Sequence, residues 1–145
     1  MDPDLRLTQA ERIISPSDFG FHNSIIHGKQ LCFIDFEYAG WDDPAKMVCD
    51  FFCQPEIPVS LDYYTYFVNR LSLMLYGEEK STALAQRVKL FFPLYRLKWC
   101  CIMLNDFTKG AGQRKRFASS GQDRRQGQLD KAISYYKRFD FKHWY

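Results

Sequence analysis

The chain has 145 residues, of which 46% are hydrophobic, 26% charged and 17% aromatic, and its formal net charge is +3. Length and composition are those of one soluble globular domain with a real core, spanning residues 1–145. The small net charge gives no support for a nucleic-acid partner, and without an apolar run of membrane length or a signal peptide we expect a cytoplasmic protein with no membrane partner.

The first predicted elements are a loop and a hairpin. Asp18 and Asn23 lie in a segment marked by Pro16 and Gly20, which is typical of a loop. Two β-prone runs follow, 24–26 and 31–34, separated by a glycine-containing connection; this pattern predicts a hairpin. Because a hairpin returns its end to its start, we expect Asp35, at the end of the second run, to lie near Asn23 and Asp18.

This stretch resembles the catalytic core of the aminoglycoside phosphotransferase and choline kinase superfamily, whose members are small-molecule relatives of protein kinases. The resemblance rests on Asp18, Asn23, the hairpin and the sequence IDFEYAG at 34–40. It implies an α+β fold, a protein-kinase-like C-terminal lobe that is mainly α-helical, with a small β-hairpin that carries the catalytic and metal site. It further implies that Asp18 orients or deprotonates a substrate hydroxyl, and that Asn23 and Asp35 bind Mg²⁺ with ATP as phosphate donor.

These residue types suit phosphoryl transfer, in which positioning and charge neutralisation matter more than covalent chemistry. A carboxylate and an amide supply the hard oxygen ligands that Mg²⁺ prefers. A second carboxylate, kept off the metal, can accept a proton from an alcohol. The structural alternative is that Asp18 and Asn23 cap a turn and that Asp35 ends a strand.

The chain departs from the family pattern in two places. Pro16 occupies the position two residues before Asp18, where the family usually has a loop-bracing His. We expect His22 to brace the loop or face the substrate rather than to bind metal. Only about fourteen residues precede the catalytic-type loop, too few for the family's N-terminal lobe with its glycine-rich loop and Lys. We therefore expect the resemblance to cover the C-terminal lobe alone. Three alternatives stay open: a fragment of a longer protein, one half of a split gene product that has a separate N-terminal lobe as its partner, and a stand-alone lobe with a different use.

Four of the residues that follow the hairpin in sequence are candidates for substrate binding. By resemblance to the matching region of the family, Glu37, Asp42 and Asp43 edge the acceptor site and hold a cationic group, and Trp41 adds a cation–π contact. Two alternatives remain open. Asp43 precedes Pro44 and is a good helix N-cap, and the Trp41 ring equally suits the core.

The rest of the sequence predicts helices over 45–52, 61–75, from after Glu78 to about Phe107, and 126–139. Pro93 is expected to kink or divide the third. The glycine-rich and basic segment 109–125 predicts a loop, with a nucleic-acid contact as its weaker alternative. The five cysteines follow no zinc or disulfide spacing, which favours buried free thiols.

The leading hypothesis is a phosphotransferase lobe that transfers the ATP γ-phosphate to a hydroxyl of a small, cationic alcohol. The rival hypothesis is a non-catalytic lobe that acts as a binding or regulatory module, or a fragment that is inactive without its N-terminal lobe. The rival predicts an exposed apolar patch where another lobe docks.

Overall fold

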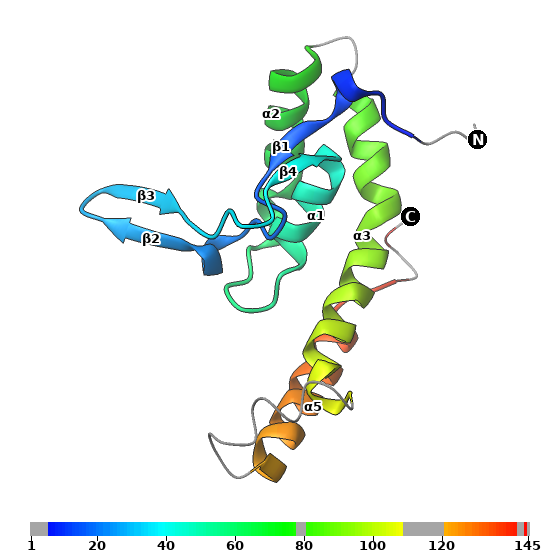
Figure 1. Cartoon of the computed structure of the whole chain (residues 1–145). Helices are drawn as coiled ribbons and strands as arrows, with labels where there is room; N and C mark the ends of the chain where they lie inside the picture. Colours follow the sequence, from blue (N-terminus) through cyan, green and yellow to red (C-terminus); the bar gives the residue numbers. More distant parts are fainter. Residues whose placement is uncertain (1–5, 78–80, 109–120, 142–143, 145) are drawn as a thin grey trace. The chain divides into compact units, whose positions relative to one another are not determined.

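The computed structural model describes residues 6–77, 81–108, 121–141 and 144. The chain forms two compact units, residues 1–92 and residues 93–145. The expected α+β fold, mainly helical with a small hairpin, is confirmed (Figure 1). The expectation of one domain over the whole chain stays a prediction.

Four short strands in the first unit form two nested antiparallel ladders. The outer ladder joins β1 (Ile13–Ser15) to β4 (Gly40–Asp42), with Ile14 opposite Trp41. The inner ladder joins β2 (Ser24–His27) to β3 (Gln30–Phe33) and is the predicted hairpin. The order β1, β2, β3, β4 therefore folds as one long hairpin interrupted midway on both arms.

The inner hairpin forms because its turn and its side chains both suit it. Gly28 has φ +63°, a left-handed conformation that glycine adopts without a steric penalty, and it lies in the two-residue turn. Ile25 and Ile26 are β-branched and favour extended backbone. Figure 1 shows the hairpin standing away from the helices of its unit, and Ile26 is 79% exposed.

Helix α1 (Pro44–Cys53) provides most of the first unit's core. It begins as the sequence predicts, with the Asp43 carboxylate accepting a hydrogen bond from the Ala45 amide at 2.8 Å and proline in the first turn. Val48 and Cys49 are fully buried, and the Cys49 and Cys53 thiols donate to the backbone oxygens of Val88 and Phe92. Two thiols one helical turn apart therefore tie α1 to the start of α3 (Ser81–Met103).

A cluster of aromatic rings joins α1 to the other helices of the first unit. Helix α2 (Tyr64–Tyr76) follows the short 3₁₀ turn η3 (Leu61–Tyr63), and its Tyr64 ring lies 5.6 Å from Phe52 and 5.9 Å from Phe92. A further 3₁₀ turn, η1 (Gln9–Glu11), precedes β1. Phe52 and Phe92 are buried, so these edge-to-face contacts lie within the core.

The second unit contains the end of α3, the turn η5 (Leu104–Phe107) and helix α5 (Gly121–Lys137). Arg96 fastens α3 to the C-terminal end of α5. Its guanidinium donates to the Tyr135 backbone oxygen at 2.7 Å and lies 3.5 Å from the centre of the Tyr135 ring. The buried Phe139 ring packs on Phe141 and Trp144 in the same unit.

Several expectations about elements need correction. Helix α3 runs through Pro93 as one helix, so the expected division is wrong, because a proline removes one backbone bond and the flanking turns still hold the helix. The expected kink at Pro93 stays a prediction. Helix α5 begins at Gly121, so residues 121–125 are helical rather than loop, while 109–120 lie outside the described residues. Cys49 and Cys53 are buried free thiols as expected, whereas Cys32 and Cys101 are exposed. Within the described residues, no helix has the length and apolar character needed to cross a membrane.

The buried position of Tyr64 leads to a prediction about alkaline stability. Burial, with smaller contributions from the nearby Cys49 and Cys53, raises the pKa of the Tyr64 hydroxyl to about 12. The unfolded chain releases this proton near pH 10, where the folded chain still holds it, so stability falls as pH rises from about 10 to about 12. Tyr64→Phe removes this loss. Urea unfolding at several pH values should therefore show wild type losing stability relative to the variant above pH 10, whereas parallel curves would contradict the assignment.

Candidate functional site

The nested ladders bring two segments of the chain face to face. Residues 16–23 connect β1 to β2, and residues 34–39 connect β3 to β4. Because β1 pairs with β4 and β2 pairs with β3, these two connections lie opposite each other between the ladders. One further bond extends the inner ladder toward them, from the Ile34 amide to the Asn23 backbone oxygen at 2.9 Å. Asp18 and Asn23 therefore lie on one segment and Asp35 on the segment that faces it.

Asp18 and Asn23 are in direct contact. The Asn23 side-chain amide donates to the Asp18 backbone oxygen at 3.0 Å and to Asp18 Oδ2 at 3.4 Å. His22 lies in the turn η2 (Phe21–Asn23), and its Nε2 is 3.3 Å from the same Oδ2. The Asp18 side chain is 50% exposed, whereas the His22 side chain is only 15% exposed. Asp18 is thus hydrogen-bonded to Asn23, lies close to His22 and remains half exposed to a ligand.

Strained backbone occurs beside Asp18 and at Asp35. Ser17 has φ +69° and Asp35 has φ +64°, and these are the only two non-glycine residues with positive φ in the part of the chain that is described. A left-handed conformation is uncommon for residues with a Cβ, although aspartate tolerates it better than most. Such strain concentrates at functional sites, where the surrounding structure maintains it. Each of the two connections, 16–23 and 34–39, therefore contains one non-glycine residue with a left-handed backbone.

Aromatic rings pack the connection between β1 and β2 against helix α1. Phe19 and Phe21 lie on either side of buried Gly20, and their rings lie 5.1 Å and 5.2 Å from the Phe51 ring of α1. Phe19 also contacts Phe33 at the end of β3, at 4.7 Å. The loop that carries Asp18 is therefore packed against both the helix and the hairpin.

Lys46 of α1 also contacts the loop that carries Asp18, at Ser17. Lys46 Nζ lies 3.0 Å from the Ser17 backbone oxygen and 3.3 Å from Ser17 Oγ. It also pairs with Asp42 Oδ2 at 2.7 Å and with Asp50 Oδ2 at 3.2 Å, and the Asp50 side chain is only 1% exposed. Lys46 was not among the predicted site residues, although its spacing of four residues from both aspartates is the usual spacing of ion pairs on a helix.

Two of the proposed substrate residues are engaged within the protein. Asp43 caps α1, as its alternative assignment expected, and its Oδ2 accepts from Arg87 Nε and Nη2, each at 2.7 Å. Asp42 pairs with Lys46, and its Oδ1 accepts from the Asp43 amide at 2.9 Å. Arg87 is distant in sequence, so nothing local predicted its pairing. The assignment of Asp42 and Asp43 to substrate stays a prediction, but both carboxylates already have a cationic partner.

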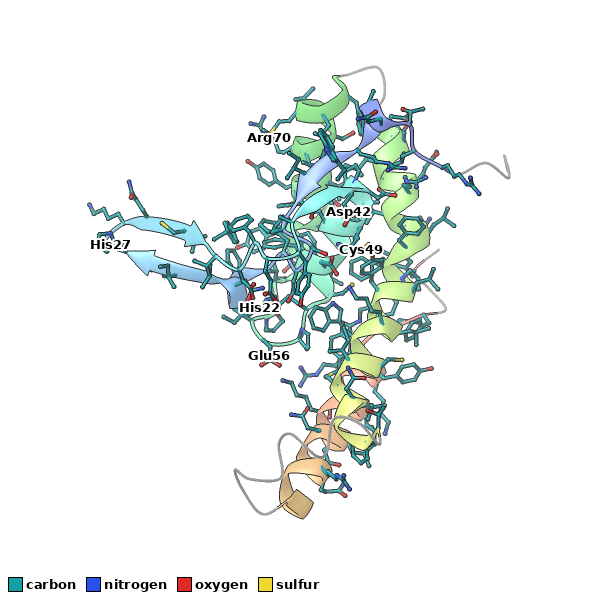
Figure 2. The ribbon with its side chains drawn as sticks, in the orientation of Figure 1. His22, His27, Asp42, Cys49, Glu56 and Arg70 are labelled. Carbon is teal, nitrogen blue, oxygen red and sulfur yellow. The ribbon has the colours of Figure 1, made fainter. Side chains whose placement is uncertain are left out.

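The other two proposed substrate residues are exposed. Trp41 is 60% exposed on β4, and Glu37 is exposed in the connection that contains Asp35 (Figure 2 shows Asp42, the next residue after Trp41). The alternative placement of the Trp41 ring in the core is therefore wrong, since the two-stranded outer ladder leaves this ring exposed. These side chains are free to meet a ligand from solvent.

The predicted Mg²⁺ ligands are two oxygen-bearing side chains, Asn23 and Asp35. Among the residues that the structure describes, no group of three or more His, Cys, Asp or Glu side chains could hold a metal ion. The predicted set differs from such a group, since it combines an amide with a carboxylate. The chain matches no protein-family model, no curated protein and no solved structure.

Gly20 is the position in the loop that tolerates least change. A Cβ added there would lie 2.6 Å from His22 Nδ1 and 3.0 Å from Gln54 Cγ, so the His22 ring would have to move from its present position. We expect Gly20→Ala to cost about 1–3 kcal/mol of stability by overpacking. Gly40→Ala is the matched control, because nothing lies within 4 Å of a Cβ at that position. Urea unfolding of both variants tests this, and equal midpoints would contradict it.

Proposed function

We propose that the chain is a phosphotransferase lobe, similar to those of the aminoglycoside phosphotransferase and choline kinase superfamily, that transfers the ATP γ-phosphate to a hydroxyl of a small cationic acceptor. The observation that supports this most is the pair of nested ladders, which presents Asp18 and Asn23 on one segment and Asp35 on the facing one. The proposal includes a separate N-terminal lobe as partner for the nucleotide.

The donor atoms near the loop suit a hard divalent cation. Asn23 uses its amide nitrogen toward Asp18, so its side-chain oxygen is the atom left for a metal. Asp35 is exposed and contributes a carboxylate on the facing segment. Mg²⁺ takes such oxygen ligands together with phosphate oxygens, whose charge it offsets when bound. Asn23 and Asp35 are the residues that would hold it.

Asp18 is the residue that we assign to the acceptor hydroxyl. His22 and Asn23 both contact its Oδ2, which leaves Oδ1 as the oxygen that can accept a proton. The half-exposed side chain allows an alcohol to approach. A carboxylate in this position orients the hydroxyl and takes its proton as the bond to phosphorus forms.

The contacts to a cationic acceptor fall to Glu37 and Trp41. Both side chains are exposed; Glu37 lies in the connection that contains Asp35, and Trp41 lies on β4 just after it. An exposed indole face attracts ammonium groups, and a nearby carboxylate adds charge attraction. Asp42 and Asp43 contribute less to substrate in this proposal, because Lys46 and Arg87 already offset their charge.

A thermal-shift titration with ATP and Mg²⁺ tests the metal–phosphate site. At a ligand concentration ten times the dissociation constant, binding to the folded state adds about 1.4 kcal/mol, which corresponds to a rise of roughly 2–6 °C in melting temperature. We expect this rise with the wild-type chain and its loss when Mg²⁺ is chelated. Asn23→Ala and Asp35→Ala should also remove it.

The matched control is Asn69→Ala, which removes an exposed amide from α2 and should retain the full shift. A wild-type chain that shows no shift at millimolar nucleotide would argue against a site formed by this lobe alone. A shift that persists in both Asn23→Ala and Asp35→Ala would place nucleotide binding elsewhere.

A non-catalytic binding or regulatory role is the second candidate, and one observation favours it. The hairpin exposes Ile25, Ile26 and Leu31 on a two-stranded ladder that stands away from the helices (Figure 1). An isolated pair of strands is only marginally stable in water, and exposed apolar side chains are typical of surfaces that bind other proteins. This candidate predicts no Mg²⁺-dependent response to ATP, so the titration above separates the two.

A further inference from the structure

Lys46 is surrounded by acceptors to an extent unusual for a lysine. Four oxygens lie within 3.3 Å of its Nζ: Ser17 O and Oγ, Asp42 Oδ2 and Asp50 Oδ2. An ammonium group has three hydrogens, so all of them can be satisfied inside the protein. Most lysines keep this group in water and leave it free to move. Here the charge is fixed at one point between α1 and the loop.

The charge balance at this point requires the lysine. The Asp50 carboxylate is almost fully buried, and a buried carboxylate without a cation is strongly unfavourable. Burial by itself lowers the pKa of Lys46, but its hydrogen bonds and charge attraction to Asp42 and Asp50 outweigh burial and raise that pKa above its ordinary value. Lys46 is therefore charged at neutral pH and keeps its hydrogens directed at these oxygens.

The bond to Ser17 acts on the peptide unit that precedes Asp18. The Ser17 backbone oxygen belongs to the planar peptide that joins Ser17 to Asp18. A hydrogen bond to that oxygen therefore restrains the orientation of the peptide plane, which includes the Asp18 Cα atom. Ser17 has a left-handed backbone, which a non-glycine residue keeps only when its surroundings hold it. Ser15 Oγ accepts from the Ser17 amide at 3.3 Å and holds the other side of the same residue.

We propose that Lys46 is a positioning residue, which clasps Ser17 and thereby sets the orientation of the Asp18 carboxylate, with Asp50 and Asp42 holding the ammonium in place. The proposal rests on the proposed function, in which Asp18 meets the acceptor hydroxyl. Pro16, two residues before Asp18, has no polar side chain for this task, and Lys46 supplies the hold from α1 instead.

Amide hydrogen exchange of the full chain, followed by NMR, tests the clasp without reference to activity. Lys46→Met keeps most of the length of the side chain and removes the ammonium. We expect the Ser17 and Asp18 amides to exchange at least tenfold faster in this variant, relative to amides in the middle of α2. Lys29→Met, in the exposed hairpin turn, is the matched control and should leave the exchange of those two amides unchanged. Wild-type exchange at Ser17 and Asp18 in Lys46→Met would overturn the proposal.

A second variant keeps the test decisive if Lys46→Met fails to fold because Asp50 loses its cation. Lys46→Met combined with Asp50→Leu removes the buried charge pair together, a change that proteins often tolerate. The clasp on Ser17 is still absent, so fast exchange at Ser17 and Asp18 in a stable double variant supports the proposal. Wild-type exchange in that variant shows that Lys46 serves only to balance Asp50, and overturns it.

Kinetics separate positioning from general loosening. A misplaced Asp18 with intact metal ligands predicts at least a tenfold fall in kcat for phosphoryl transfer, while the dissociation constant for Mg²⁺ and ATP changes less than about twofold. Equal losses in both quantities would contradict a specific effect on Asp18. If the wild-type chain shows no response to Mg²⁺ and ATP, this lobe alone forms no nucleotide site, and the exchange experiment still decides whether Lys46 holds the loop.

Discussion

Asp18→Asn should lower the rate of phosphoryl transfer by about 10²- to 10⁴-fold, which is the usual contribution of a general base. The variant keeps the shape of the side chain and its contacts with His22 and Asn23, so the loop should stay in place. What it loses is an oxygen that can accept a proton. The measurement is transfer of labelled γ-phosphate from ATP to a panel of small amino alcohols, in the presence of Mg²⁺.

The matched control for this experiment is Asp62→Asn, which neutralises an exposed aspartate of η3 that bonds Ser60. It should leave the rate unchanged. The thermal shift produced by Mg²⁺ and ATP should survive in Asp18→Asn, because the metal ligands are Asn23 and Asp35. A wild-type rate in Asp18→Asn would remove Asp18 from the reaction, even if nucleotide binding is intact.

Phe51→Ala should be the most destabilising single substitution near the site, at about 3–5 kcal/mol. The ring is buried and meets four others, including Phe19 and Phe21 of the loop and Phe67 of α2. Removing it leaves a cavity and ends several aromatic contacts at once. Urea unfolding gives the loss directly, and the loss of the Phe19 and Phe21 contacts should also broaden the NMR signals of the loop.

Two further variants provide comparisons for the loss of stability in Phe51→Ala. Phe51→Leu fills most of the cavity and should cost much less. Phe36→Ala truncates a phenylalanine that is exposed between β3 and β4, and should change stability by less than about 0.5 kcal/mol. A small effect of Phe51→Ala, close to that of Phe36→Ala, would mean that the rings between α1 and the loop contribute little to its hold.

The features that the sequence predicted correctly are those with local causes. A glycine-containing connection between β-branched runs predicted the inner hairpin, and Asp43 before Pro44 predicted the start of α1. Each depends on a few neighbouring residues, whose conformational preferences act whatever the rest of the chain does. The grouping of Asp18 and Asn23 followed from the same short stretch.

The features that the sequence did not predict depend on distant partners. The outer ladder joins two strands of three residues, too short to show a period, and it forms because the inner hairpin brings their ends together. The pairing of Asp43 with Arg87 and the clasp of Lys46 on Ser17 depend on how α1 packs. The early start of α5 at Gly121 goes against the low helix propensity of glycine, which local patterns weigh too heavily.

The rate at which the two thiols between α1 and α3 are chemically modified can report motion inside the first unit. Cys32 and Cys101 are exposed and open to a maleimide at once, whereas Cys49 and Cys53 are fully buried, with their sulfurs against backbone oxygens of α3 (Figure 2 labels Cys49). A buried thiol is modified only when its surroundings open. The rate of the slow phase of labelling therefore reports how often α1 and α3 separate, without any added probe. A slower rate in the presence of nucleotide would show that a ligand at the loop reduces the motion of α1.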